Sequence, residues 1–255
     1  MPRTSSKKGP TNSAASSTVD LFRAASGKAA SKELERIDQL FHSYANISSG
    51  MIDPEGIETL CSDLEVDHTD VRILMLAWKM RAEKQGYFTL DEWRRGLKAL
   101  RADTILKLKK ALPELEKEVR RTSNFVDFYS YAFRYCLTGM LIYVKLQNLC
   151  LELLVTVYWF VLYVLPEEKQ KSIDIESISV LLDLVLGPHF QPQVDALVQY
   201  LKTQIDYKVI NMDQWMGFYR FCNEISFPDL SNYDSDLAWP LVLDNFVDWM
   251  RDKQG

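Results

Sequence analysis

The chain has 255 residues, of which 47% are hydrophobic and 25% are charged, and its formal net charge is -5. This length and composition indicate a globular protein that can bury a core in one large domain or two small ones. Residues 1–30 hold five lysines and arginines against one aspartate, so they carry +4 and the remainder carries -9. An acidic body argues against nucleic acid as the main partner and favours a basic protein surface.

Residues 1–30 are rich in Ser, Ala, Lys and Gly, and they predict a disordered basic tail because they offer little apolar surface. The pair Lys7-Lys8 resembles a weak nuclear-import signal, but such a pair is also typical of solubilising charge. The sequence shows no secretory signal. The cysteines lie in apolar surroundings without the spacing of metal ligands, and we expect all four to be buried free thiols: Cys61, Cys136, Cys150 and Cys222.

Helical periodicity begins at residue 31, where Ser31 can serve as the N-cap of a first helix. The next segments form two helix-loop-helix units, with Gly50 in the first loop and Gly86 in the second. Further helices are predicted over residues 103–121, 123–137, 174–187, 191–205, 211–225 and 240–252. Strand alternation is scarce apart from short apolar pieces after the two glycines. The sequence therefore predicts an all-α fold, with an EF-hand-like helix-loop-helix pair followed by a C-terminal helical bundle.

Residues 149–165 depart from this pattern because they are nearly continuous apolar sequence with a single acid, Glu152. This run is slightly shorter than the ~20 residues that a bilayer-spanning helix needs. The excess of Lys and Arg on its flanks is slight, so it gives little indication of a membrane orientation. A hydrophobic helix outside any membrane and a membrane span are both compatible with this segment.

The two glycine loops invite comparison with a calcium site, in which oxygen ligands occupy positions 1, 3, 5 and 12 and glycine occupies position 6. The first loop has Ala45 at position 1, and the second has Arg81 there, although Glu92 stands at its position 12. Neither loop can neutralise a divalent cation, so we expect no metal. The three histidines are scattered and no phosphate-binding loop is present, so we expect neither an active site nor a cofactor.

The stretch 229–250 combines a dense helical pattern of apolar residues with five aspartates and no lysine or arginine. Asp244 and Asp248 stand four residues apart, and like charges at this spacing destabilise an isolated helix by roughly 0.2–0.5 kcal/mol. Asp244 lies in the first turn of a predicted helix, and Asp213 follows the predicted N-cap Asn211. A negative charge at either position also stabilises its helix, because it lies near the positive end of the helix dipole. The sequence is therefore compatible with two roles for these aspartates, which are stabilisation of their own helices and binding of a cationic partner.

Four stretches resemble the defective-in-cullin-neddylation (DCN1-like) family and its potentiating-neddylation domain. They occur in the order typical of the family and read AWKMRAEKQGYFTLDEW, NFVDFYSYAFRYC, KSIDIESISVLLDLVLG and SNYDSDLAWPLVLDNFVDW. The resemblance covers residues 31–252 and is interrupted at 139–166 by an atypical hydrophobic insertion. We interpret this insertion as an added or mis-spliced segment in a loop between helices.

The resemblance implies a non-catalytic, scaffold-type E3 cofactor that promotes transfer of a ubiquitin-like modifier from its E2 to a cullin. It implies that the C-terminal winged-helix domain of the cullin binds at Asp213, Ala238 and Asp244. It also implies a pocket for the acetylated N-terminal methionine of the E2, lined by Ile57, Ile73, Leu76, Ala77, Met80, Gln85, Phe88 and Leu184.

The cullin-associated RING protein is a further expected partner, whereas nucleic acid and membrane are not. The expected locations are the nucleus and the cytoplasm. The alternative interpretation is a calcium-independent, EF-hand-like regulatory adaptor that is anchored to a membrane through residues 149–165.

Overall fold

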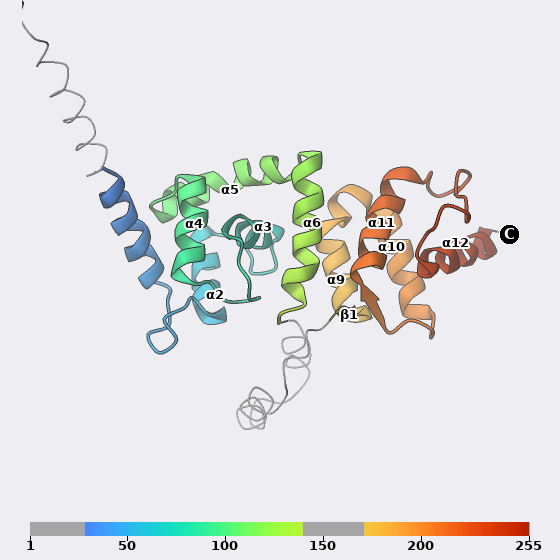
Figure 1. Cartoon of the computed structure of the whole chain (residues 1–255), viewed down its shortest axis with the longest axis horizontal. Coiled ribbons are helices and arrows are strands. Elements are labelled where there is room, and N and C mark those ends of the chain that lie inside the picture. Colours follow the sequence, from blue (N-terminus) through green and yellow to red (C-terminus); the bar gives the residue numbers. More distant parts are fainter. Residues whose placement is uncertain (1–28, 140–170, 255) are drawn as a thin grey trace, which may run out of the picture.

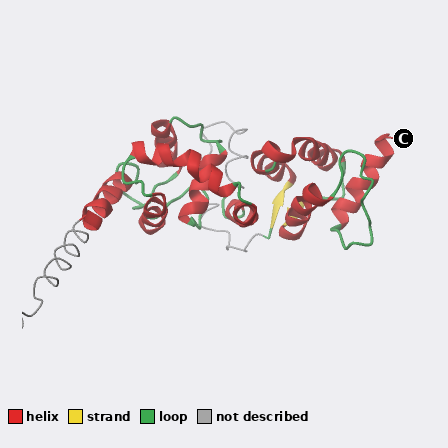
Figure 2. Ribbon diagram, turned by 90° about the horizontal axis from the view of Figure 1, so that it is seen from above, coloured by secondary structure: helices red, strands yellow, loops and turns green. Residues whose placement is uncertain are grey.

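The computed structural model describes residues 29–139 and 171–254 and is mostly helical (Figure 1). A helix at residues 29–42 is followed by α2 (Pro54–Leu64), α3 (Val71–Met80), α4 (Leu90–Leu100), α5 (Ile105–Val119) and α6 (Thr122–Cys136). The C-terminal half contains α9 (Ile175–Val185), α10 (Gly187–Thr203), α11 (Met212–Glu224) and α12 (Leu241–Gln254). Figures 1 and 2 show these helices arranged along one long axis, with α6 between the two groups in Figure 1.

Most helices begin at a polar side chain that accepts a hydrogen bond from the first turn, as N-caps do. These N-caps are Asp53, Asp70, Thr89, Thr104, Asp174 and Asn211. The predicted N-cap at Ser31 is wrong, because the first helix already includes residues 29 and 30. Both of these residues are alanine, the strongest helix former, so the helix extends past the predicted boundary.

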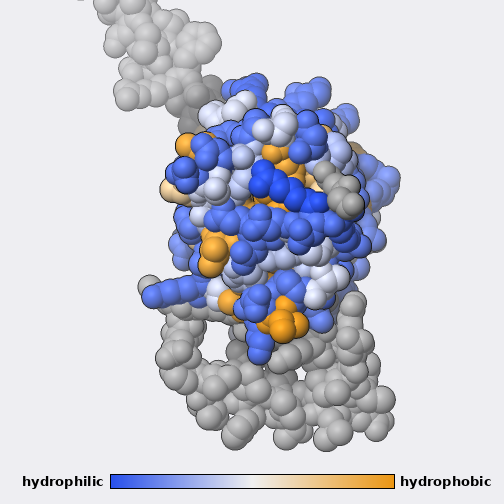
Figure 3. Space-filling view, turned by 90° about the vertical axis from the view of Figure 1, so that its right-hand side faces the viewer, coloured by the Kyte–Doolittle hydropathy of each residue, from blue (hydrophilic) through white to orange (hydrophobic). Residues whose placement is uncertain are grey.

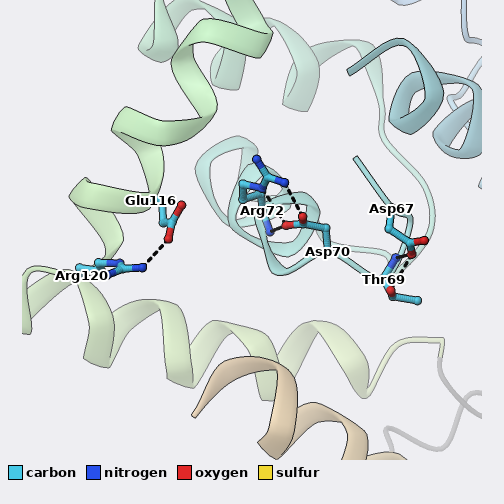
Figure 4. A network of polar contacts seen from close by, with 6 residues as sticks. All are labelled: Asp67, Thr69, Asp70, Arg72, Glu116 and Arg120. Carbon is cyan, nitrogen blue, oxygen red and sulfur yellow. Dashed lines mark hydrogen bonds and ion pairs between the residues drawn. The ribbon is translucent and has the colours of Figure 1, made fainter. Parts of the chain in front are cut away.

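The start of α3 shows how one such cap is built (Figure 4). The Asp70 carboxylate accepts hydrogen bonds from the backbone N–H of Arg72 at 2.8 Å and from its Nε at 2.9 Å. In the preceding turn, Asp67 accepts hydrogen bonds from the backbone N–H and the hydroxyl of Thr69. These contacts lower the pKa of both aspartates, so the cap stays charged at neutral pH. The cap fixes the beginning of the helix that carries four of the residues predicted for the E2 pocket.

Two short strands correct the prediction of an all-α fold. Strand β1 (Ser172–Asp174) pairs antiparallel with β2 (Val209–Asn211), with Ile173 opposite Ile210. Each strand runs directly into a helix, α9 or α11. Three residues are too few to show an alternating pattern, so sequence periodicity could not reveal them.

The apolar pieces after Gly50 and Gly86 also pair with each other. The backbone groups of Ile52 and Phe88 exchange two N–H···O bonds, at 3.0 and 2.9 Å. Both glycines have positive φ, +67° and +78°, a conformation that favours glycine. The two loops therefore lie side by side, whereas the description of this half as EF-hand-like stays a prediction.

Helix α6 joins the two halves through a pair of large buried aromatic residues. The rings of Tyr129 on α6 and Trp215 on α11 are stacked with centroids 4.1 Å apart. The Tyr129 hydroxyl donates to the Trp215 carbonyl, and the Trp215 indole N–H donates to the Tyr129 carbonyl, both at 3.0 Å. Every polar group of the two side chains is thus satisfied inside the core, as burial requires.

Within the part of the chain that the structure describes, no helix is long and apolar enough to cross a membrane. The hydrophobic run 149–165 and Cys150 lie outside the described residues. The other three cysteines are buried and free, as predicted: Cys61, Cys136 and Cys222. Burial raises the pKa of the Cys136 thiol to about 12, so this thiol is unreactive at neutral pH.

Candidate functional site

The predicted cullin-binding residues lie on α11, on α12 and in the segment between them. Asp213 is exposed in the first turn of α11, after a capping box between Asn211 and Gln214. Asp244 is half-buried in the first turn of α12. Ala238 is exposed in the connecting segment. The predicted N-cap at Asn211 is confirmed.

The two helices approach each other closely at Gly217. A methyl group added to Gly217 would lie 2.7 Å from Cγ of Pro240, so only a glycine fits here without a shift. Asp213 precedes Gly217 by one helical turn, and Asp244 follows Pro240 by the same number of residues. Residues four apart lie on one face of a helix. Both aspartates are therefore placed one turn from the same contact.

Ala238 adopts a left-handed backbone conformation with φ +48°. This conformation costs a non-glycine residue of order 1–3 kcal/mol, so the surrounding contacts must hold it. The indole N–H of the following residue, Trp239, donates to the Asp234 carbonyl at 3.0 Å. The Trp239 side chain is buried, with 7% of its surface exposed, and it therefore anchors the segment. Ala238 is exposed to the solvent.

Both aspartates lack an ion pair within the part of the chain that the structure describes. Neither Asp213 nor Asp244 forms a salt bridge with any lysine, arginine or histidine among the described residues. Asp244 Oδ1 accepts one hydrogen bond, from the Tyr233 hydroxyl at 2.6 Å. Figure 3 faces the end of the molecule that carries α12 and shows mostly hydrophilic surface with separate hydrophobic areas. This arrangement can bind a cationic partner, although the assignment of these residues to cullin binding stays a prediction.

The residues predicted for the E2 pocket come from α2, α3, the loop before α4, and α9. Five of them belong to the hydrophobic core and are at most 9% exposed: Ile73, Leu76, Ala77, Met80 and Phe88. Three are half-buried: Ile57, Gln85 and Leu184. The five core residues are therefore closed to a partner in this structure, and only the three half-buried residues are partly accessible.

Gln85 differs from its apolar neighbours because its side-chain oxygen is buried and has no hydrogen-bond partner within the described part of the chain. Oε1 accepts no hydrogen bond from the residues that the structure describes. The loop around it is fixed to α6, because the backbone N–H of Gln85 donates to Thr138 Oγ1 at 2.8 Å and that of Gly86 donates to the Tyr135 hydroxyl at 3.2 Å. A buried acceptor without a donor is costly.

A cleft of about 1010 Å³ opens between α3, α4 and α6 and contains none of the residues predicted for the pocket. Its wall carries charges of both signs. Lys79 pairs with Glu118 at 2.6 Å, and Asp127 accepts a hydrogen bond from the Trp78 indole N–H at 2.8 Å. Such a mixed and partly paired lining is typical of a solvated groove. Residues 29–139 and 171–254 contain no group of three or more His, Cys, Asp or Glu side chains that could hold a metal ion.

Sequence reasoning did not find two residues beside the predicted patch, of which one contacts Asp244 and the other contacts the neighbour of Ala238. Tyr233 donates to Asp244, and Arg220 stacks on Trp239 with its guanidinium carbon 4.1 Å from the ring centroid. Tyr233 stands in the SNYD motif that carried the family resemblance, so its presence was visible. Its hydrogen bond was not, because the two residues are eleven positions apart across an irregular segment.

Comparison with known proteins tests the resemblance directly. The family model described as cullin binding matches residues 142–249. Human DCN1-like protein 4 is 36% identical over 220 residues, which cover 86% of this chain and 64% of that protein. Human DCN1-like protein 5 is 33% identical over 214 residues, which cover 84% of this chain and 76% of that protein. DCN1-like protein 4 of Drosophila melanogaster is 33% identical over 198 residues, or 78% of this chain and 67% of that protein.

These matches confirm the predicted resemblance over most of the chain. The family consists of non-catalytic cofactors of neddylation, which agrees with the prediction of a protein without an active site. The chain belongs to the DCN1-like protein family.

Proposed function

We propose that this protein binds a cullin through its acidic C-terminal end and assists the transfer of a ubiquitin-like modifier from an E2 to that cullin. One observation carries the proposal. Asp213 and Asp244 lie one helical turn from the same α11–α12 contact, and neither has a cationic partner among the described residues. Two uncompensated carboxylates beside a small exposed residue, Ala238, suit a basic and closely approaching protein surface.

The proposed cullin partner is the C-terminal winged-helix domain, which would bring lysines or arginines to the two carboxylates. Charge pairs of this kind mainly set the orientation of a complex and the rate of encounter. Binding should therefore weaken as the salt concentration rises, because exposed charges are screened within about 10 Å at 0.1 M.

The proposed E2 contact is the acetylated N-terminal methionine, bound against the half-buried Ile57 and Leu184 with Gln85 as acceptor. Burying one methionine side chain supplies roughly 1.5–3 kcal/mol. Acetylation helps because it removes a terminal ammonium charge whose desolvation would oppose entry. It also leaves an amide N–H that can donate to Gln85 Oε1, which has no partner among residues 29–139 and 171–254.

Holding both partners on one body raises the transfer rate through proximity and orientation, without side-chain chemistry. Two weak contacts on one molecule also provide avidity. The cullin-associated RING protein would act in the same assembly. The expected location in the nucleus and the cytoplasm stays a prediction.

A reconstituted transfer assay with purified E2, cullin and modifier tests the proposal. We expect the wild-type chain to accelerate cullin modification and Asp244→Lys to abolish both acceleration and cullin binding. Asp91→Lys is the matched control, because Asp91 is exposed on α4 in the other half of the molecule. Full cullin affinity in Asp244→Lys, with the control also normal, would place cullin binding elsewhere.

The E2 contact needs a test that keeps the core intact. Ala77→Arg does not meet this need, because Ala77 is 1% exposed and a buried arginine would disrupt the fold. Leu184→Asp places the charge at a half-buried position and should weaken binding of an acetylated E2 peptide. Unchanged peptide affinity in a folded Leu184→Asp variant would refute the proposed pocket.

A further inference from the structure

The Asp244 carboxylate is held by one neighbour and free on its other side. Oδ1 accepts the Tyr233 hydroxyl at 2.6 Å, a short charge-assisted bond, whereas Oδ2 accepts no hydrogen bond from the described residues. Burial, and next the bond to Asp244, raise the pKa of Tyr233 well above its usual value. The hydroxyl therefore keeps its proton and remains a donor throughout the physiological pH range.

Tyr233 is itself held in place by an aromatic stack. Its ring lies on Trp239 with centroids 5.5 Å apart and an interplanar angle of 23°. The Arg220 guanidinium also lies on Trp239, and it binds Glu224 one turn further along α11 at 2.9 Å. A continuous series of contacts thus runs from α11, through the connecting segment, to the carboxylate on α12.

These contacts also surround Ala238. Trp239 follows it in the chain, and Arg220 Nη1 donates to the carbonyl of Leu237, which precedes it, at 3.5 Å. The left-handed conformation of Ala238 is therefore fixed by contacts on both sides. The same stack orders two of the three residues of the predicted patch.

We propose that Tyr233 is a positioning residue for cullin binding. Its hydroxyl holds the Asp244 carboxylate so that Oδ2 of Asp244 faces the cationic side chain of the partner. Trp239 and Arg220 keep Tyr233 in place. This inference rests on the proposed function. A free carboxylate would lose rotational freedom on binding, whereas one that is already held loses less.

Four charged or titratable groups face this site from the elements packed around it. Asp248 and Arg251 lie on α12 close enough to influence Tyr233, Arg220 lies on α11, and Tyr207 lies before β2. Arg251 is 5.9 Å from the centre of the Tyr233 ring, measured from its guanidinium carbon, and forms no ion pair with Asp244 among the described contacts. The hydroxyl of Tyr233 is thus the direct polar contact of the Asp244 carboxylate within the described part of the chain.

The test removes this hydroxyl and leaves the ring. Tyr233→Phe keeps the stack on Trp239 and should weaken the affinity for a purified cullin winged-helix domain by roughly 2- to 13-fold, the range expected from ordering one side chain. In the transfer assay, KM for the cullin should rise by a similar factor while kcat stays unchanged. Tyr44→Phe is the matched control, because the Tyr44 hydroxyl also donates to an aspartate, Asp63 at 2.7 Å, but in the N-terminal half of the molecule. That variant should keep wild-type affinity.

A double-mutant cycle separates positioning from general stability. In an Asp244→Ala background, Tyr233→Phe should have no further effect on binding, whereas a purely structural role would weaken binding equally in both backgrounds. Unchanged or tighter cullin binding by Tyr233→Phe alone would overturn the inference. Failure of the proposed function has a different signature, because Asp244→Lys would then bind the cullin normally.

Discussion

The buried oxygen of Gln85 leads to a prediction in which stability and binding change in opposite directions. The side chain lies under the end of α6, where a methyl on Gly139 would come within 3.0 Å of Gln85 Cβ. An unsatisfied buried acceptor costs about 1–3 kcal/mol, and the lower end applies here because Gln85 is only half-buried as a residue. Gln85→Met keeps the length of the side chain and removes the acceptor. We expect it to stabilise the free protein by about 1 kcal/mol, which raises Tm by about 2–4 °C for a chain of this size.

The same substitution should weaken binding of an acetylated methionine peptide, because the hydrogen bond to Oε1 is lost. One such bond contributes about 0.5–1.5 kcal/mol, so we expect Kd to rise roughly 2- to 13-fold in a fluorescence anisotropy titration. Gln204→Met serves as the control, because both polar atoms of the Gln204 side chain are hydrogen-bonded and its loss should lower Tm. A Gln85→Met variant with a lower Tm, or with unchanged peptide affinity, would refute the reasoning.

Two further predictions concern stability. Hydrogen bonds from Lys107 and then Arg36 lower the pKa of Asp103 to about 2, below its ordinary value of 3.8. The charged Asp103 carboxylate therefore stabilises the fold fully above about pH 4, and this stabilisation is lost as the pH falls from about 4 to 2. Asp103→Asn should be less stable than wild type at neutral pH in urea unfolding. The difference in stability should shrink as the pH falls through this window. Tyr129→Phe removes the hydroxyl bond to the Trp215 carbonyl but keeps the stack, and should lower the free energy of unfolding by about 0.5–1.5 kcal/mol. A stability difference between wild type and Asp103→Asn that stays the same at every pH would contradict the first expectation. A Tyr129→Phe variant as stable as wild type would contradict the second.

The helices could be predicted because caps and apolar periodicity agree along most of the chain. The prediction of a helix over 103–121 corresponds to α5 at Ile105–Val119, and that over 211–225 to α11 at Met212–Glu224. The largest difference is at α10, predicted from residue 191 but observed from Gly187. Phe190 has non-helical backbone angles and marks a kink, so the predicted helix is the part that follows the kink.

The candidate sites could be predicted only in part, because the type of a residue does not tell whether its side chain is exposed in the folded protein. Ala77 and Leu184 are both apolar residues at helical spacing, yet Ala77 belongs to the core and Leu184 is half-buried. That Asp213 has no cationic partner among the described residues could likewise not be predicted, because lysines and arginines from distant segments can neutralise an aspartate in the folded chain. Asp103 illustrates this, since its partner Arg36 is 67 positions away.

The relation between the two candidate sites depends on α6. Seven of the eight residues predicted for the E2 pocket lie on α2, on α3 and in the loop before α4, whereas the eighth, Leu184, lies on α9. The predicted cullin-binding residues lie on α11, on α12 and in the segment between them, at the C-terminal end of the molecule. Helix α6 contacts α3 on one side and α11 on the other, and Tyr129 fixes it to Trp215 by stacking and by two hydrogen bonds. A cofactor that works by orientation needs such a rigid connection, because any freedom between the sites lowers the effective concentration of one bound partner at the other. The buried aromatic pair at the centre of the molecule is therefore as important for the proposed function as the exposed carboxylates, although it touches neither partner.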